Sequence, residues 1–322
     1  MTIASQHSSG DILADRRADY ARMLAEGGDF SGAAELMEQA LEISPDWAAG
    51  WYHLAEYAEK AADRKAAAAA LGRVLALAPE DPFGATLRLA VLGAADVPAA
   101  PPSRYVEQLF DDYAQRFDTA LVGKLDYSVP QKLAALVDEG IETRHFAHVT
   151  DLGCGTGLFG ERIRERAAFL EGFDLSANML AKAREKRVYD RLAQADLSLA
   201  PEDSGVFDPA HAVERADLAS AADVLMYLGN LAPVFVIAAR LVAAGGHFAF
   251  SVEDAEAEEA YVLRPSLRYA HGEGYVRECA QEAGFTVLES RQTVIRTDAG
   301  APVTGRLYLA RRRGPTPGGS AG

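Results

Sequence analysis

Apolar and polar positions follow two different periods along this chain. In residues 11–96, small and apolar side chains return every three to four positions, which predicts a series of amphipathic helices. From residue 145 onward, short apolar runs alternate with helical stretches. Strands that alternate with helices predict a mostly parallel, doubly wound sheet. The pattern therefore predicts an all-α part followed by an α/β part.

The second part is expected to open with an amphipathic helix, in which Tyr105, Leu109, Tyr113 and Phe117 share one face. A second short helix follows Pro130. The strands are expected at 145–152, 169–174, a stretch ending near 195, 216–225 and 247–253, and the helices between and after them at 158–167, 176–187, 231–242 and 274–283. Two further apolar runs, 285–295 and 303–311, flank a turn at 298–300 and predict an antiparallel hairpin.

The first part contains an internal repeat with an offset of 34 residues. The sequence ALEISP at 40–45 recurs as VLALAP at 74–79, and Gly28-Asp29 recurs as Ala62-Asp63. This period, with two helices and a closing proline in each unit, resembles tetratricopeptide repeats. The resemblance implies two units and a capping helix near 82–92, and an unrelated alanine-rich helical bundle is the alternative. Because about three repeats are needed for an array to fold stably by itself, two repeats are expected to depend on contacts with the rest of the protein for their stability.

Composition changes mark the expected boundaries. The segment 97–103 holds three prolines and no charge before Arg104, which is typical of a linker. We expect a disordered N-terminus over 1–10, helical repeats over 11–96, this linker, an α/β domain over 104–312 and a disordered tail over 313–322.

Charge and cysteine content exclude several classes of protein. The formal net charge of −15 repels nucleic acid, and we expect no nucleic-acid partner. Two cysteines in 322 residues make no disulfide framework. The first residues lack the apolar core of a signal peptide. The most apolar segment, 218–246, is interrupted by polar residues and fits a buried strand, turn and helix. We therefore expect a soluble cytoplasmic protein that does not enter a membrane.

The stretch DLGCGTGLFG at 151–160 carries the candidate chemistry. Read from Gly155, it matches the dinucleotide-binding pattern G-x-G-x-x-G, and read from Gly153 it gives G-x-G-x-G. Both patterns place a ligand at the carboxyl end of the first strand. Asp151 is a poor neighbour for the pyrophosphate of NAD, but it suits a cationic cofactor. S-adenosylmethionine carries an ammonium and a sulfonium and has no phosphate, so the second pattern favours it.

Four stretches together resemble the class I S-adenosylmethionine-dependent methyltransferases: DLGCGTG, GFDLSANML, QADL and AADVLMYLGNL. The segment at 110–130 is similar to the lid of bacterial methyltransferases that also carry tetratricopeptide repeats. The resemblance covers residues from about 103 to 311. It implies a Rossmann-like domain of roughly seven strands, the last two antiparallel.

The resemblance also implies a set of cofactor-binding residues. Asp174 would hold the ribose hydroxyls, and Asp196 the adenine amine with Leu197 beside it. The methionine end would be lined by Asp151, Gly153, Gly155 and Gly157. The adenine would be flanked by Leu175 and Met179. For Leu175 and Met179, plain core packing is the alternative. Residues 105–117 are expected to form a lid, whose Tyr113 would reach the carboxylate of the cofactor.

The methyl acceptor is less well defined by the sequence. His271 is the candidate general base, with a surface or capping role as the alternative. Tyr227 and Tyr269 are candidates for an aromatic acceptor pocket, with core packing as the alternative. Arg296 and Arg268 are candidates for binding an acidic acceptor, with pairing to surface carboxylates as the alternative. No metal is expected. We favour O- or N-methylation of a small molecule. The alternatives are a protein acceptor or partner recruited by the repeats and a scaffold that only senses the cofactor.

Overall fold

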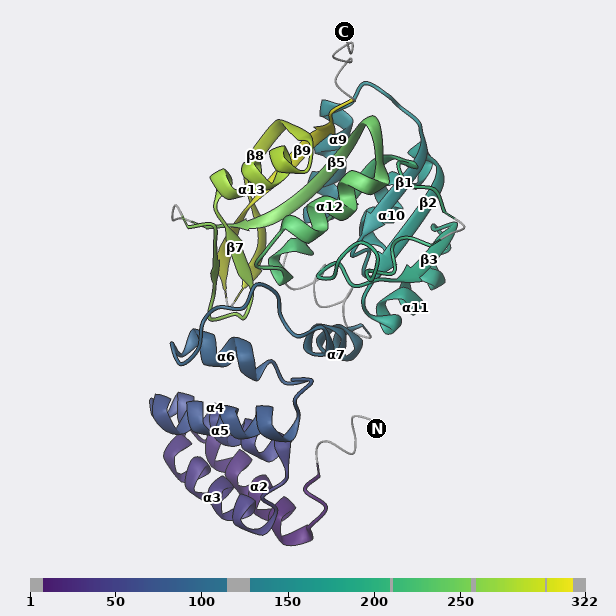
Figure 1. Cartoon of the computed structure of the whole chain (residues 1–322). Coiled ribbons are helices and arrows are strands. Elements are labelled where there is room, and N and C mark those ends of the chain that lie inside the picture. Colours follow the sequence, from purple (N-terminus) through teal and green to yellow (C-terminus); the bar gives the residue numbers. More distant parts are fainter. Residues whose placement is uncertain (1–7, 115–127, 209–210, 256–258, 299, 315–322) are drawn as a thin grey trace. The chain divides into compact units, whose positions relative to one another are not determined.

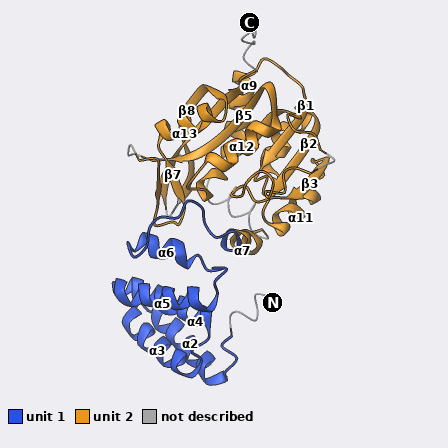
Figure 2. Cartoon of the chain, viewed as in Figure 1, with its two compact units in different colours: residues 1–105 blue, residues 106–322 orange. Residues whose placement is uncertain are grey.

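The computed structural model describes residues 8–114, 128–208, 211–255, 259–298 and 300–314 (Figure 1). The chain divides into two compact units, residues 1–105 and 106–322 (Figure 2). The first unit is built of helices alone among its described residues, and the second is a mixed α/β unit.

The first unit repeats a pair of helices. Its helices are α2 (Ile12–Glu26), α3 (Phe30–Ile43), α4 (Ala48–Lys60), α5 (Arg64–Leu77) and the short α6 (Ala85–Val91). Asp29 and Asp63 cap α3 and α5, and their carboxylates accept hydrogen bonds from the backbone of Gly32 and Ala66. The caps are 34 residues apart, so the repeated helix pair is confirmed. Its identity as a tetratricopeptide unit stays a prediction.

The second unit is a sheet covered by helices. Its strands are β1 (Phe146–Leu152), β2 (Ala167–Asp174), β3 (Arg191–Gln194), β4 (Ala216–Ala221), β5 (Val242–Asp254), β6 (Tyr261–Leu263), β7 (Tyr269–His271), β8 (Phe285–Asp298) and β9 (Ala301–Arg312). Its helices are α9 (Val129–Gly140), α10 (Leu158–Ile163), α11 (Ala177–Lys186), α12 (Ala232–Leu241) and α13 (Glu273–Glu282), while α7 (Ser103–Tyr113) crosses the boundary between the units.

The sheet follows the doubly wound plan. Strands β3-β2-β1-β4-β5 are parallel neighbours in that order. Strand β9 pairs antiparallel with β5 and with β8, as the sequence predicted for the last two apolar runs. The chain order reverses between β1 and β4, which is where ligands bind in this class of sheet.

One part of the sheet was not predicted. Strands β6 and β7 form a small antiparallel hairpin within a region that we expected to be a loop. Strand β7 then runs parallel to the end of β5, at Glu253 and Asp254. The described residues thus form nine strands, where roughly seven were expected. Three-residue strands are too short to show the alternation of apolar and polar residues that identifies a strand.

The core lies on both faces of the sheet. Phe248 and Phe250 of β5 pack with Phe235 of α12 on one face. Ala249, which lies between them, packs with Leu133 of α9 on the other face. Because neighbouring strand residues point to opposite faces, both faces are apolar and the strand reads as a continuous apolar run.

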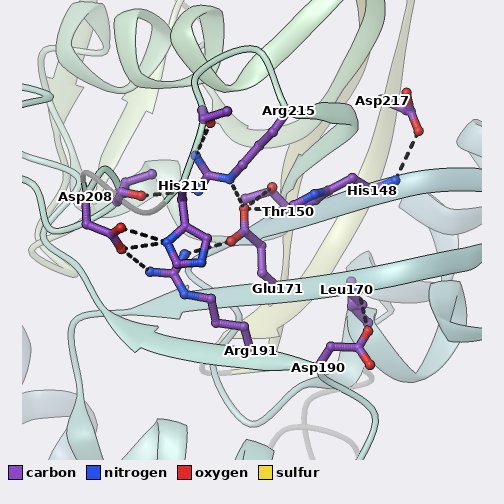
Figure 3. A network of polar contacts seen from close by, with 12 residues as sticks. His148, Thr150, Leu170, Glu171, Asp190, Arg191, Asp208, His211, Arg215 and Asp217 are labelled. Carbon is purple, nitrogen blue, oxygen red and sulfur yellow. Dashed lines mark hydrogen bonds and ion pairs between the residues drawn. The ribbon is translucent and has the colours of Figure 1, made fainter.

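A buried ion-pair network anchors the segment between β3 and β4 (Figure 3). Glu171 of β2 has no exposed side-chain surface. Its carboxylate accepts hydrogen bonds from Thr150 (2.8 Å), Arg215 (2.8 Å) and Arg191 (2.9 Å). Arg191 also pairs with Asp208 at 2.7 Å. One carboxylate thus joins β1, β2 and β3 to the segment at 198–215.

Candidate functional site

The glycines after β1 adopt backbone conformations that other residues rarely reach. The φ angles of Gly153, Gly155 and Gly157 are +68°, +54° and +91°. A side chain at Gly153 would collide with Val224, and one at Gly157 with Tyr189. A Cβ at Gly155 would meet no atom within 4 Å, so open space borders the loop at this residue. The loop therefore offers bare backbone to a ligand at the carboxyl edge of the sheet.

Asp174 lies at the end of β2 and holds this loop in place. Its carboxylate accepts hydrogen bonds from the backbone of Gly155 (2.8 Å) and Ser176 (2.9 Å). Burial raises the pKa of Asp174 to about 6 against the effect of these bonds, and nearby Asp111 raises it further. The carboxylate thus lies beside the open space at Gly155, and its pKa is set by burial, backbone hydrogen bonds and a second carboxylate.

Asp151 lies beneath the glycine loop and is 1% exposed. Its two oxygens accept hydrogen bonds from the hydroxyls of Tyr189 (2.7 Å) and Ser220 (2.8 Å). Burial raises its pKa to about 6. Asp151 therefore connects the loop to β4 and to the start of β3. A direct contact with a ligand would require one of these hydroxyls to give way.

Asp196 follows β3 and is supported by the segment that comes after it. Its backbone N–H donates to the carbonyl of Ser204 at 2.8 Å, and its carboxylate accepts from the backbone (2.9 Å) and hydroxyl (2.6 Å) of Ser198. Leu197 is buried in the core, and Met179 is fully buried on α11. Leu175 is half-buried, and its carbonyl accepts from the side chain of Gln194.

Helix α7 contacts the segments that follow β2 and β4. Its Asp111 accepts hydrogen bonds from the hydroxyl of Ser176 (2.6 Å) and the backbone of Asn178 (3.3 Å), just after β2. Its Phe110 packs edge-to-face on Tyr227, which follows β4, with ring centroids 5.0 Å apart. Residues 115–117 of the expected lid lie outside the described residues. Tyr113 is half-buried and packs against the apolar cluster around α9.

Three arginines and two carboxylates gather after β4 and β5. Arg296 is 3% exposed and pairs with Asp223 at 3.3 Å and with Glu253. Glu253 also pairs with Arg264 at 2.9 Å. Arg268 donates a hydrogen bond to Tyr227, and this contact, together with the nearby carboxylates, raises the pKa of the guanidinium although burial opposes it. The group carries a net positive charge.

Asp223 shows that this cluster is conformationally strained. Its φ angle of +59° is unusual for a residue with a side chain, and such strain often accompanies a functional site. Burial raises its pKa to about 6, while Arg296 acts in the opposite direction. Val224, the next residue, contacts Gly153, so the arginine cluster and the glycine loop are neighbours.

The structure gives His271 and Tyr269 a different setting from the one expected. His271 is fully buried, and its Nε2 lies 2.7 Å from the carbonyl of Leu228. Burial lowers its pKa to about 4. This placement does not support a general base, because a base needs a nitrogen within reach of the acceptor. Tyr269 is also fully buried, and its ring packs edge-to-face on that of Tyr261.

The residues at the loop fit S-adenosylmethionine better than a dinucleotide. A pyrophosphate is held by backbone N–H groups of a glycine loop, but the N–H of Gly155 is already bound to Asp174. Asp111, Asp174 and Asp151 make this end of the sheet anionic, which favours a cationic ligand. Asp174 beside open space at Gly155 is suited to accept hydroxyl groups of a ribose.

Four residues of the site escaped the sequence analysis. Tyr189 and Ser220 bind Asp151, Asp111 binds Ser176, and Glu171 anchors the segment that supports Asp196. Only Glu171 left a signal, as a charged residue in the middle of an apolar strand. The others are polar residues of common types, far in sequence from the groups that they contact.

Among the described residues, no group of three or more histidine, cysteine or carboxylate side chains is arranged to hold a metal ion. In the same part of the chain, no helix has the length and apolar character to cross a membrane.

Comparison with known proteins agrees with this geometry. Residues 150–248 match the family model described as a methyltransferase domain. The chain is 33% identical over 108 residues to the malonyl-[acyl-carrier protein] O-methyltransferase of Salmonella typhimurium, covering 34% of this chain and 39% of that protein. The enzyme of the same name from Enterobacter lignolyticus is 40% identical over 68 residues, or 21% of this chain and 27% of that protein. The chain thus matches well under half the length of these relatives.

A solved structure supports the fold. The chain superposes on the 1,6-didemethyltoxoflavin-N1-methyltransferase of Burkholderia thailandensis, which was crystallised with 1,6-didemethyltoxoflavin and S-adenosylhomocysteine. The TM-score is 0.51 at 19% identity, over 68% of this chain and 94% of that one. The likeness shows a common fold. The family model identifies residues 150–248 as a methyltransferase domain.

Proposed function

Because the chain carries such a domain, we propose that it transfers a methyl group from S-adenosylmethionine to a carboxylate oxygen of a small or carrier-bound acid. The observation that carries this proposal is the arginine cluster beside the glycine loop, where Val224 contacts Gly153. Arginine binds carboxylates through two parallel hydrogen bonds. The partial relatives are named for O-methylation of malonyl-[acyl-carrier protein], which also carries a carboxylate.

The cofactor residues have separate tasks in this proposal. Asp174 accepts from the ribose hydroxyls, the glycine loop faces the methionine end, and Asp196 lies at the adenine end. Asp151 acts indirectly, by holding the loop through Tyr189 and Ser220. When bound, S-adenosylmethionine supplies an electrophilic methyl group, which an acceptor oxygen takes in line as the carbon–sulfur bond breaks.

A carboxylate acceptor explains why the described site offers no convincing general base. A carboxylate is already deprotonated at neutral pH, so no proton has to be removed before it attacks. The protein then has to align the oxygen with the methyl group and exclude water. Arg268 and Tyr227 serve the alignment, and α7 serves the exclusion of water.

The product distinguishes this proposal from its alternatives. The purified full-length chain is incubated with S-adenosylmethionine labelled in its methyl group and with malonyl-acyl-carrier protein, malonyl-coenzyme A or a panel of amines and phenols. We expect label on the acids as a methyl ester, which releases methanol in mild base. Base-stable label on amines, or label on proteins alone, would contradict carboxylate methylation. Binding of the cofactor without any transfer would favour the scaffold.

Arg268 provides a second test of the acceptor site. We expect Arg268→Gln to raise the KM for the acid about tenfold to 100-fold, because a charge-assisted hydrogen bond contributes about 1.5–3 kcal/mol. The affinity for S-adenosylhomocysteine, measured by calorimetry, should stay unchanged. Arg277→Gln is the matched control, since Arg277 is 46% exposed and pairs with Glu273 on the same helix. Equal KM values for Arg268→Gln and the control would exclude Arg268 from acceptor binding.

Helix α7 is proposed to act as a lid, and hydrogen exchange tests this. We expect amide protons of residues 106–113 to exchange more slowly when S-adenosylhomocysteine binds, because the ligand would lie beneath the helix and hold it closed. Peptides from α12 serve as the internal control. Asp111→Ala should remove part of the protection, since Asp111 joins the helix to Ser176 and Asn178. Exchange that is equally slow with and without the ligand would identify α7 as a fixed helix.

A further inference from the structure

Helix α2 carries an apolar stripe on its exposed side. Tyr20 and Leu13 are each 62% exposed and Met23 is 60% exposed. The full stripe is Ile12, Leu13, Arg16, Tyr20, Met23 and Leu24, which fall within one third of the helix circumference at 100° per residue. Soluble monomers rarely leave several large apolar side chains together on one helix face.

The internal repeat allows the stripe on α2 to be compared with the equivalent positions of the second helix pair. The positions 34 residues after Leu13, Tyr20 and Met23 are Trp47, Leu54 and Tyr57 of the second helix pair. These three are only 8%, 4% and 8% exposed. The same positions are therefore buried in the second pair and exposed in the first.

The preceding helix pair covers the face of α4. Leu41 of α3 lies so close to α4 that a side chain at Gly50 would collide with it. Met37 and Leu41 of α3 belong to the same buried cluster as Leu54 and Tyr57. Helix α2 opens the first pair, so no helix precedes it among the described residues. Within the described part of the chain, this face of α2 is therefore an uncovered stacking surface.

The stripe is symmetric about its own centre. Reversing the helix around residue 18 exchanges Ile12 with Leu24, Leu13 with Met23, and Arg16 with Tyr20. All six positions of the stripe therefore fall on positions of the stripe. An antiparallel pair of identical helices would bring apolar residues onto apolar residues at both ends. It would also place each arginine over a tyrosine ring near the centre, a favourable arrangement.

We propose that the stripe on α2 binds the same stripe of a second copy of this chain, in an antiparallel pair with a two-fold axis at residue 18. A self-complementary patch of this kind closes after two subunits. Head-to-tail stacking of repeats is disfavoured, because α6 packs at the other end of the array, where its Ala85 and Leu87 are fully buried. Two helices of 15 residues make a small interface, so we expect a dimer that dissociates at micromolar concentration.

Sedimentation velocity of the full chain tests the dimer. Over about 1 to 100 µM, we expect the wild-type chain to pass from monomer to dimer and to go no further. Tyr20→Glu with Met23→Glu should leave a monomer at every concentration, because four like charges would meet in the pair. Thermal melting would show whether this variant stays folded. Val236→Glu is the matched control, as Val236 is 43% exposed on α12 of the other unit.

A monomeric wild type, assembly beyond a dimer, or a dimer that survives the double substitution would each overturn the proposal. Cysteine cross-linking tests the register independently of stability. A mixture of the Leu13→Cys and Met23→Cys chains should form a disulfide at least tenfold faster than Leu13→Cys alone, since two copies of residue 13 would lie about 15 Å apart. The native cysteines, Cys154 and Cys279, are both buried. Equal rates in the mixture and the single variant would exclude this pairing.

Discussion

Asp174→Ala is expected to weaken the binding of S-adenosylhomocysteine about tenfold to 100-fold. The carboxylate accepts from the backbone of Gly155 and Ser176, and it borders the open space beside the glycine loop. Alanine would remove the acceptor for the ribose hydroxyls and would release the loop at the same time. Loss of charge-assisted hydrogen bonds costs about 1.5–3 kcal/mol of binding free energy, which corresponds to a Kd that is about tenfold to 100-fold higher.

Calorimetry on the folded variant measures this effect. Glu185→Ala is the control, because Glu185 lies on the next helix, is 65% exposed and pairs with Lys182 of the same helix. A ligand-induced rise in melting temperature should be nearly lost in Asp174→Ala and kept in the control. Normal affinity in the variant would mean that the ribose binds elsewhere, and it would overturn the cofactor site.

The pH dependence of binding gives the same residue a second signature. Burial raises the pKa of Asp174 to about 6, above the ordinary value of an aspartate. A raised carboxyl pKa favours the protonated form in the folded chain, so this group's contribution to stability is lost as pH rises through about 6. The affinity for the ligand changes with pH in the opposite direction to the stability, because only the ionised carboxylate of Asp174 can accept hydrogen bonds from two hydroxyls. Affinity should therefore rise between pH 5 and pH 7 in the wild type and change less in Asp174→Ala.

The sequence was a good guide wherever a residue's task is local. Gly153, Gly155 and Gly157 need positive φ angles, and the spacing of glycines reveals that need. Asp174 ends β2 and Asp196 follows β3, and the carboxyl ends of parallel strands meet at one edge of the sheet. The 34-residue period likewise paired Asp29 with Asp63, and in the structure these two residues cap α3 and α5.

The sequence was a poor guide wherever a task depends on distant contacts. The unperturbed pKa of a histidine made His271 a candidate base, but the hairpin β6–β7 buries it against the carbonyl of Leu228. For Arg296 the sequence left two roles open, binding an acidic acceptor or pairing with carboxylates, and only the structure shows its pairs with Asp223 and Glu253. The pairing of Asp151 with Tyr189 spans 38 residues, and no local pattern marks such a contact.

The long segment before β4 shows the same limit. Its sequence is rich in charge and proline, which is typical of a surface loop. In the structure, its Val206 is fully buried, and its Phe207 ring lies under the guanidinium groups of Arg215 and Arg240. Through the bond from Asp196 to the carbonyl of Ser204, this segment also supports the cofactor site.

Glu171→Gln is therefore expected to be among the most destabilising single changes in this chain. Glutamine has nearly the same shape, but it removes the charge that pairs with Arg215 at 2.8 Å and with Arg191 at 2.9 Å. Breaking a buried ion pair at one partner costs about 3–5 kcal/mol, because the remaining charge stays buried without compensation. Glu161→Gln is the control, since its pair with Lys186 is half-exposed and should contribute under about 1 kcal/mol.

Urea unfolding at several pH values tests both the size and the sign of this effect. Burial alone would raise the pKa of Glu171, but hydrogen bonds from its neighbours lower it to about 2. The stabilisation is then complete above the ordinary glutamate pKa, about 4.3, and is lost as pH falls toward 2. The difference in unfolding free energy between wild type and Glu171→Gln should thus be largest at neutral pH and should shrink in acid. If Glu171→Gln unfolds like Glu161→Gln at pH 7, the network does not hold this segment.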